Sequence, residues 1–194
     1  MLRTDLYADP HGRFVHDVVL ESCSRFANKT AIIDTSYNHR ISYAEYGEMV
    51  EALARGLVLA GLRPGEIVAI NLPNCWEFCV AYHAATLAGA VPTLLNPSYR
   101  EREVRYQLVN SGATILITDG PQLEGINLTG LPSLRRVYTT RQASVGAEVF
   151  ASLLHPVTVD LPRAEKPSDQ TLAVPPTPAA PPVFPRGSCC RTTI

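Results

Sequence analysis

The sequence lacks a dominant charge of either sign. Lysine and arginine together number 17 and aspartate and glutamate 18, which gives a net charge of −1 over 194 residues. This balance leaves no electrostatic footprint for nucleic acid, and no run of basic residues would attract the chain to an anionic membrane surface. We therefore expect no nucleic-acid partner, whereas small ligands of weak or no charge remain open.

Cysteine is scarce, and its spacing fits neither a disulfide framework nor a metal site. The five cysteines are odd in number and show no repeated C-x-x-C pair, which argues against paired disulfides and against a zinc site. They are Cys23, Cys75, Cys79, Cys189 and Cys190. A chain with free thiols is typical of a reducing compartment, so we expect a cytoplasmic location.

The sequence also lacks a secretory leader and an uninterrupted membrane span. Its opening, MLRTDLYADPHG, has no apolar core of the kind that a signal peptide needs. Residues 78–95 are apolar and uncharged, but Gly89 and Pro92 divide this stretch and His83 lies inside it. These breaks predict a buried helix followed by a buried strand, and no transmembrane segment.

What is present is an alternation of apolar strands and amphipathic helices. With 46% hydrophobic and 18% charged residues, the composition predicts one sizeable core. Strands are expected at residues 30–34, 66–72, 91–95, 114–118 and 135–139. The continuous apolar run at 66–72, EIVAINL, is typical of a central parallel strand covered on both faces.

Helices are expected between these strands, each with a recognisable start. Residues Ser42 and Glu45, Asn74 and Glu77, and Ser98 and Glu101 each have the spacing of a capping box, and Gly61, Gly89 and Gly112 mark the three helix ends. A further short helix is expected at 147–154. Strand and helix alternation with short links predicts an α/β fold, with a mostly parallel sheet flanked by helices.

Several of these segments, in this order, resemble a known family. The stretches ISYAEYGEMVEALARGLVLAGLRPGEIVAINLPNCWEF, LAGAVPTLLNPSYREREVRYQLVNSGATILIT and KPSDQTLAV are similar to the N-terminal portion of the adenylate-forming enzymes. Within that superfamily they resemble the AMP-forming acid:CoA ligases, such as coumarate and fatty acid CoA ligases. The resemblance covers about residues 17–174 and implies an incomplete domain, the N-terminal subdomain of the adenylate-forming fold.

The last twenty residues depart from the family pattern. After a strand resembling residues 169–174, the family has a phosphate-binding loop of the form YSSGTTGLPKG, whose backbone N–H groups, hydroxyls and lysine approach the ATP phosphates. This chain continues instead with PPTPAAPPVFPRGSCCRTTI, which holds six of the sixteen prolines and no carboxylate. Proline has no N–H to donate and fixes φ, so this tail could not form such a cradle.

The missing loop is spelled by the tail in a displaced reading frame. When each codon takes the last base of the preceding codon and the first two bases of its own, residues 177–194 permit YSSGTTGLPKGVMLSHHN without a gap. A natural proline-rich disordered tail would explain the composition, but it does not predict the motif. The sequence therefore predicts a frameshift near residues 174–176, through a mutation, a sequencing slip or a gene-model error.

The resemblance implies what the complete parent does and what this chain lacks. Such a ligase activates a carboxylic acid with ATP and Mg²⁺ to an acyl-adenylate and then transfers the acyl group to CoA. The loop lysine, the metal-binding glutamate, the acid pocket and the C-terminal domain all lie beyond residue 174 in the family. We therefore assign no catalytic, cofactor-binding or metal residue, and expect residues 1–174 to be a truncated, inactive fragment and 175–194 a disordered tail.

Individual residues of the retained part are expected to be structural. His83 lies in an apolar helix and is expected to be a satisfied core or groove histidine, while Cys75 and Cys79 share a helix face as packing residues. Trp76 and Tyr82 are expected at the core or its rim, and residues 96–98 form a turn and cap. The alternative to an enzyme fragment is a stand-alone α/β binding or interaction module, which should protect its sheet edges.

Overall fold

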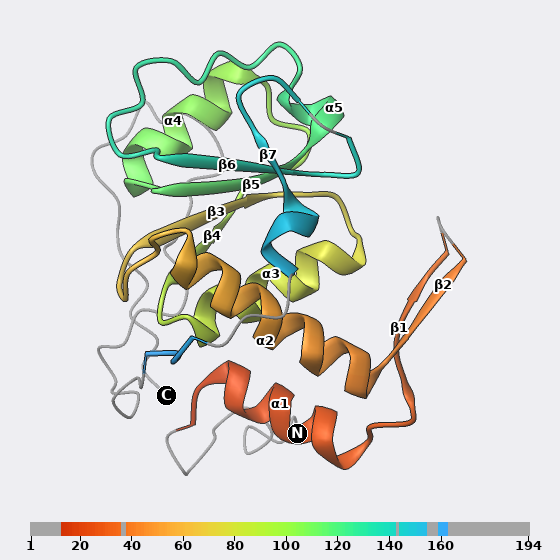
Figure 1. Ribbon diagram of the computed structural model, residues 1–194. Helices are drawn as coiled ribbons and strands as arrows, with labels where there is room; N and C mark the ends of the chain where they lie inside the picture. Colours follow the sequence, from red (N-terminus) through yellow and green to blue (C-terminus); the bar gives the residue numbers. More distant parts are fainter. Residues whose placement is uncertain (1–12, 36–37, 143, 155–158, 163–194) are drawn as a thin grey trace, which may run out of the picture.

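A parallel β-sheet forms the centre of the computed structural model, which describes residues 13–35, 38–142, 144–154 and 159–162. Its strand order is β4-β3-β5-β6-β7, and every neighbouring pair is parallel (Figure 1). The strands are β3 (Ile67–Asn71), β4 (Val91–Leu94), β5 (Ile115–Asp119), β6 (Arg136–Thr140) and β7 (Glu148–Val149). The predicted α/β class with a parallel sheet flanked by helices is confirmed.

Helices cover both faces of this sheet. On one face lie α2 (Tyr43–Leu59), α3 (Trp76–Leu87) and the 3₁₀ helix η2 (Phe150–Leu154), and on the other lie α4 (Glu101–Ser111) and the short α5 (Gly120–Leu123) (Figure 1). Helix α1 (Val15–Arg25) packs on α2 and α3 rather than on the sheet. Among the described residues no helix has the length and apolar character needed to cross a membrane.

The start of α2 follows directly from its sequence. The Ser42 N–H donates to Glu45 Oε2 at 2.8 Å, and the Glu45 N–H donates to Ser42 Oγ at 3.2 Å, which is the predicted capping box. Along the helix, the inward face carries Val50, Leu53 and Leu57, each 0% exposed. The cap and the apolar face together fix where α2 begins and which side it buries.

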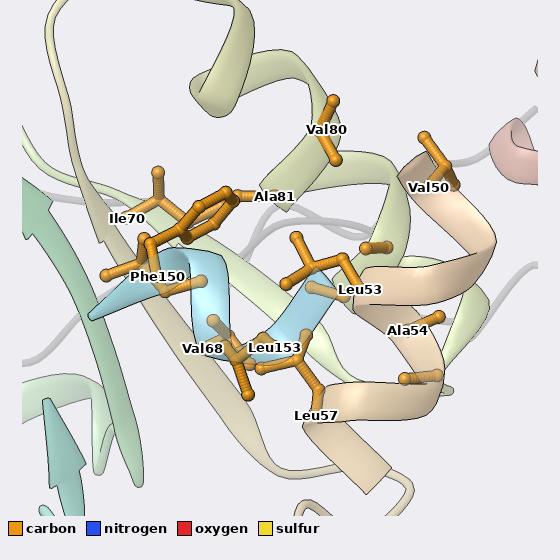
Figure 2. Close-up of a cluster of buried hydrophobic side chains, with 14 of the residues drawn as sticks. Val50, Leu53, Ala54, Leu57, Val68, Ile70, Val80, Ala81, Phe150 and Leu153 are labelled. Atoms are coloured by element: carbon orange, nitrogen blue, oxygen red, sulfur yellow. The ribbon is translucent and has the colours of Figure 1, made fainter. Parts of the chain in front are cut away.

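The core lies between α2, α3, η2 and the near face of the sheet. Figure 2 shows Leu53 and Leu57 of α2 pointing toward Val68 and Ile70 of β3, with Phe150 of η2 closing the cluster. These side chains are almost fully buried, from 0% to 3% exposed. Burying a side chain of this size stabilises a fold by about 1.5–3 kcal/mol, so this cluster is the main source of stability on this face.

Two predicted helix starts are wrong. Helix α3 has Cys75 at its N-cap, and Glu77 is buried instead of reaching back to Asn74. Helix α4 has Arg100 at its N-cap; Ser98 is held in a local turn, where its N–H donates to Asn96 Oδ1 at 2.9 Å. An asparagine that closes its own turn competes with capping, so the turn at residues 96–98 is confirmed but its cap is not.

The structure corrects or adds several other elements. The expected helix at 147–154 is a short strand, β7, followed by η2. The predicted strand at 30–34 exists as β1 (Thr30–Asp34), but it pairs antiparallel with the unpredicted β2 (His39–Ser42) outside the parallel sheet. Helices α1 and α5 were not expected from the sequence. For α5, which has four residues, tertiary partners decide the structure more than the local pattern does.

Both edges of the parallel sheet are poor templates for further pairing. In β4, Pro92 has no N–H to offer, and the outward carbonyl of Leu94 already accepts a hydrogen bond from Gln107 Nε2 at 2.9 Å. At the opposite edge, β7 has only two residues, Glu148 and Val149. Short or capped edges of this kind prevent edge-to-edge association.

Substituting Gly56 with alanine should destabilise the core. A Cβ at this position would lie 2.2 Å from the backbone oxygen of Leu153, so α2 and η2 would have to separate. We expect the free energy of unfolding to fall by about 1–3 kcal/mol, the usual cost of overpacking. Chemical denaturation would measure it, with Glu48→Ala on the exposed side of α2 as the control. An unchanged Gly56→Ala midpoint would contradict the close packing.

Candidate functional site

The candidate site is the edge of the sheet at which its parallel strands end. The chain runs from β3 through α3 to β4 on one side, and then returns through α4 to β5 on the other side of β3. This reversal makes the boundary between β3 and β5 a topological switch point. In open α/β sheets, ligands bind outside the carboxyl ends of the strands at such a point.

Polar side chains occupy the ends of the strands at this edge. In the pairing register Asn71 lies opposite Thr118, and Thr118 opposite Thr139, on the α4 face of the sheet. One position further along, Asp119 lies opposite Thr140 on the face of α2 and α3. All five are buried, with exposed fractions from 0% to 7%. The three strands β3, β5 and β6 therefore each end in buried polar side chains.

A part-buried ion pair links the last residue of β5 to the residue that follows β6. Arg141 Nη1 donates to Asp119 Oδ2 at 3.3 Å, while Asp119 Oδ1 has no hydrogen-bond partner. The segments that follow the two strands also touch, because a Cβ on Gly120 would lie 2.8 Å from the backbone oxygen of Gln142. Glycine at 120 therefore allows these two segments to approach closely.

The amino terminus of α3 brings a thiol and a carboxylate to the same edge. Burial, opposed by a hydrogen bond from the Phe78 N–H and by Arg141 and assisted by Glu77, raises the pKa of the Cys75 thiol to about 11. Glu77 itself is buried, and its Oε2 has no hydrogen-bond partner. A thiol with this pKa is protonated at neutral pH, so Cys75 is not a nucleophile here.

The described groups at this edge do not fit ATP phosphates. Three of the buried atoms without partners here are acceptors, Asn71 Oδ1, Glu77 Oε2 and Asp119 Oδ1, and the fourth, Thr140 Oγ1, is a single neutral hydroxyl. Phosphate binding requires several donors and positive charge. The described lysine, Lys29, lies over the Phe26 ring at 4.9 Å, in the turn that follows α1. Among the described residues no cluster of three or more His, Cys, Asp or Glu could hold a metal ion.

His83 is satisfied by hydrogen bonds rather than poised as a base. Its Nδ1 lies 2.5 Å from the Tyr46 hydroxyl and 3.1 Å from the Cys79 carbonyl oxygen. Burial lowers the pKa of His83, the Cys79 hydrogen bond opposes this, and the charge of His16 lowers it further. These contacts agree with the expected structural role, and burial likewise raises the pKa of Cys79 and favours its packing role.

The aromatic residues of α3 lie at the rim of the core, as expected. Trp76 meets Phe150 edge to face, with ring centroids 6.2 Å apart, and Tyr82 meets His83 in the same way at 5.2 Å. The sequence analysis missed the polar strand ends. The signal was available, since Asn71 interrupts the apolar run EIVAINL just where a buried strand should continue apolar.

Two grooves lie away from the strand ends of β3. The larger, of about 750 Å³, lies between the segment after α5 and the segment after β6, and Glu124 is the ionisable side chain in its lining. A smaller groove of about 310 Å³ separates the end of α2 from β6 and η2, beside Arg136 and Glu148. Those two side chains pair with each other at 2.6 Å, so neither groove offers a constellation of free catalytic groups.

A comparison with protein families finds one that spans most of the chain. The model of the family described as "AMP-binding enzyme" matches residues 19–182. The match begins close to the predicted start near residue 17 and continues eight residues past Val174.

Curated relatives carry related names. The chain is 30% identical to 4-coumarate-CoA ligase 1 of Narcissus pseudonarcissus over 174 residues, which cover 88% of this chain and 31% of that protein. It is 38% identical to triostin synthetase I of Streptomyces triostinicus over 102 residues, 53% of this chain and 19% of that protein. The chain thus spans about a third or less of these relatives.

Solved structures share the fold. A benzoate CoA ligase from Burkholderia xenovorans LB400 superimposes with a TM-score of 0.68 at 21% identity, covering 82% of this chain and 32% of that chain. A Mycobacterium tuberculosis fatty acyl CoA synthetase gives 0.66 at 24% identity, with 79% and 30% covered. The described body therefore has the fold of one part of these larger proteins.

Two buried threonines should respond in opposite ways to replacement by valine. Thr140 Oγ1 has no hydrogen-bond partner, so Thr140→Val removes an unsatisfied hydroxyl and should raise the free energy of unfolding by about 1 kcal/mol. The Thr93 hydroxyl accepts from Gln107 Nε2 at 3.3 Å, so the matched control Thr93→Val should lower it by about 1 kcal/mol. Urea denaturation measures both, and equal losses would contradict the unsatisfied state of Thr140.

Proposed function

Because this chain belongs to the AMP-binding enzyme family, we propose that it is the N-terminal portion of an AMP-forming acid:CoA ligase. The complete parent activates a carboxylic acid with ATP, releasing pyrophosphate and forming an acyl-adenylate. The thiol of CoA then displaces AMP to give the acyl-CoA. ATP, Mg²⁺ and CoA are thus cofactors and substrates of the parent, and a small carboxylic acid is its partner.

The family match is the observation that carries this proposal. It is supported by relatives named as CoA ligases in several plants, including 4-coumarate-CoA ligase 1 of Narcissus pseudonarcissus. The solved proteins of the same fold are named for different acids, among them benzoate and fatty acids. The class of substrate we propose is therefore the carboxylic acid, which all these names have in common.

The chain itself is proposed to be catalytically inactive. Its described strand ends offer unpartnered acceptors rather than the donors that a triphosphate needs. The segment expected to carry the phosphate loop, residues 175–194, holds prolines instead and lies outside the described residues. Without N–H donors at those positions the segment could not form the phosphate cradle that the family resemblance implies.

The proline-rich end is proposed to be a frameshift product. Its displaced reading, YSSGTTGLPKGVMLSHHN, restores the glycine-, serine- and threonine-rich loop directly after residues 169–174. A shift among the proline codons near residue 175 accounts for the whole segment at once. On this proposal Cys189 and Cys190 are accidents of reading frame and form no site. The three described thiols are free, which suits the cytoplasmic location that we propose.

A stand-alone binding or interaction module is the second candidate, and one observation favours it. The described sheet ends at one side in Pro92 and the capped Leu94 carbonyl, and at the other in the two-residue β7. Protected edges suit a body that folds without further strands. A cooperative melt of the chain with no dye-binding apolar surface would favour the module, whereas strong dye binding would favour the fragment.

Restoring the frame near residue 175 should produce an active ligase. The extended protein should release pyrophosphate from ATP when supplied with one acid of a panel of carboxylic acids, because the loop then offers N–H donors and a lysine to the phosphates. The chain as it stands should release none. Replacing the lysine of the restored loop by alanine should abolish most of the activity.

Sequencing the source DNA across the codons of residues 174–176 separates the origins of the shift. The adjacent codons of Pro175 and Pro176 imply a run of cytosines in the gene. A run that differs in length from the one implied by this sequence would mean that the native protein is full length, and an unchanged run would mean that the gene itself carries the frameshift. A well-folded, restored protein with no activity toward any acid of the panel would contradict the proposed ligase.

A further inference from the structure

Helix α1 is attached to the rest of the molecule by few buried groups. Of its residues, His16 and Cys23 are buried, at 6% and 5% exposure, while Val15 and Val18 are largely exposed. It packs on α2 and α3 (Figure 1). Cys23 lies against Gly47 of α2, because a Cβ added to Gly47 would lie 3.0 Å from the Cβ of Cys23. The state of His16 therefore matters greatly for whether α1 stays in place.

His16 is held in a site that suits only the neutral imidazole. Its Nδ1 is buried without a hydrogen-bond partner, and its ring stacks on Phe14 with centroids 5.1 Å apart. Its Nε2 lies 3.8 Å from Asp17 Oδ1, beyond a good hydrogen bond. A protonated ring would carry a second N–H donor with no acceptor, inside an apolar contact.

A second histidine faces the same interface from α3. His83 Nδ1 lies within hydrogen-bond distance of the Tyr46 hydroxyl of α2. That hydroxyl donates to the Cys79 carbonyl oxygen at 3.0 Å. Burial lowers the pKa of His83, and the charge of His16 adds to this lowering. Protonating both rings would place two like charges at the junction of α1, α2 and α3.

Among the described residues, one anion is available near this junction to balance such charges. The titratable side chains in contact with the two imidazoles are Asp17 from α1, Tyr46 from α2 and Tyr82 from α3. Two thiols lie close by: Cys23 packs against Gly47, next to Tyr46, and the backbone carbonyl of Cys79 accepts from the Tyr46 hydroxyl. Burial raises the pKa of each of these thiols and phenols, so they stay neutral at and below pH 7. The remaining group, Asp17, has a half-exposed side chain and partly opposes the lowering of the His16 pKa by burial.

The direction of the pH effect follows from these pKa values. Burial lowers the pKa of both histidines below their ordinary value of 6.5. The protein with α1 detached therefore binds protons more tightly than the protein with α1 docked. Docking is therefore fully stabilised above about pH 6.5 and weakens as the pH falls from there toward the lowered values. The other described histidine, His39, is exposed on β2 and has no part in this contact.

We infer that α1 is an acid-released cover: protonation of His16 and His83 separates it from α2 and α3 and uncovers Cys23 and Tyr46, while the sheet stays folded. None of the described histidines lies in the buried clusters on the two sheet faces, which α2, α3, η2 and α4 cover. Helix α1, which packs on α2 and α3, adds Cys23 to one of these clusters, with Val19 and Leu20 packed against it. The release is thus local. It requires no ligand and is independent of the proposed ligase activity.

Hydrogen exchange of the full chain, measured by mass spectrometry at about pH 7.5 and about pH 5, tests this inference. These values lie on either side of the ordinary histidine pKa. After correction for intrinsic exchange rates, protection of the peptides of α1 should fall about tenfold or more at the lower pH. Protection of β3 and β5 should change far less.

Substitutions identify the groups responsible. His16→Phe with His83→Gln keeps an aromatic ring beside Phe14 and a side chain able to hydrogen-bond the Tyr46 hydroxyl but removes both titrations, so α1 protection should no longer depend on pH. His39→Gln, the control on the exposed strand β2, should behave like the wild type.

Three outcomes would overturn the inference. The first is wild-type α1 protection that is equal at both pH values, and the second is a loss of protection shared equally by α1 and β3. The third is a pH effect that persists in the double variant. If the double variant does not fold, the wild-type profile and His83→Gln alone decide the question, because release predicts a smaller pH effect in that single variant.

Discussion

The burial of β3 on both faces is the constraint on which the rest of this structure depends. Val68 and Ile70 are fully buried against α2, α3 and η2, while Ala69, between them, is fully buried in the cluster that α4 covers. A strand enclosed in this way can satisfy its backbone only by pairing on both sides, as β3 does with β4 and β5. The parallel order and the two helical layers follow from that requirement.

The same enclosure explains the character of the candidate site. Where the strands end, helices and loops still cover them, so polar residues placed there are buried as well. Hydrogen bonds satisfy some of these groups, such as Thr93 with Gln107, whereas acceptors such as Asn71 Oδ1 and Asp119 Oδ1 have no partner. Unpartnered buried acceptors are costly, so the polar strand ends contribute less to stability than the apolar strand interiors do.

The inner helix α2 and the outer helix α1 differ in the contacts that hold them in place. The packing of α2 on the sheet is apolar and close, down to the contact of Gly56 with Leu153. The packing of α1 on α2 and α3 includes two histidines and a tyrosine, which makes this outer layer sensitive to protonation in a way that the apolar core is not. Stability is therefore unevenly distributed, with the sheet as its strongest part.

Sequence alone was sufficient for the class of fold, four of the five strands of the parallel sheet and the start of α2, because long apolar runs and the Ser42–Glu45 box are local signals of burial and capping. It also determined the family resemblance, which rests on the order of several segments. Only the tertiary structure decided that Ser98 serves a turn and not a cap, that β1 leaves the main sheet to pair with β2, and that Glu77 turns inward. Those features depend on contacts between residues distant along the chain. The contacts of Tyr46 with His83 and of Asp119 with Arg141 are of the same kind, since no local pattern records which side chains the fold brings together.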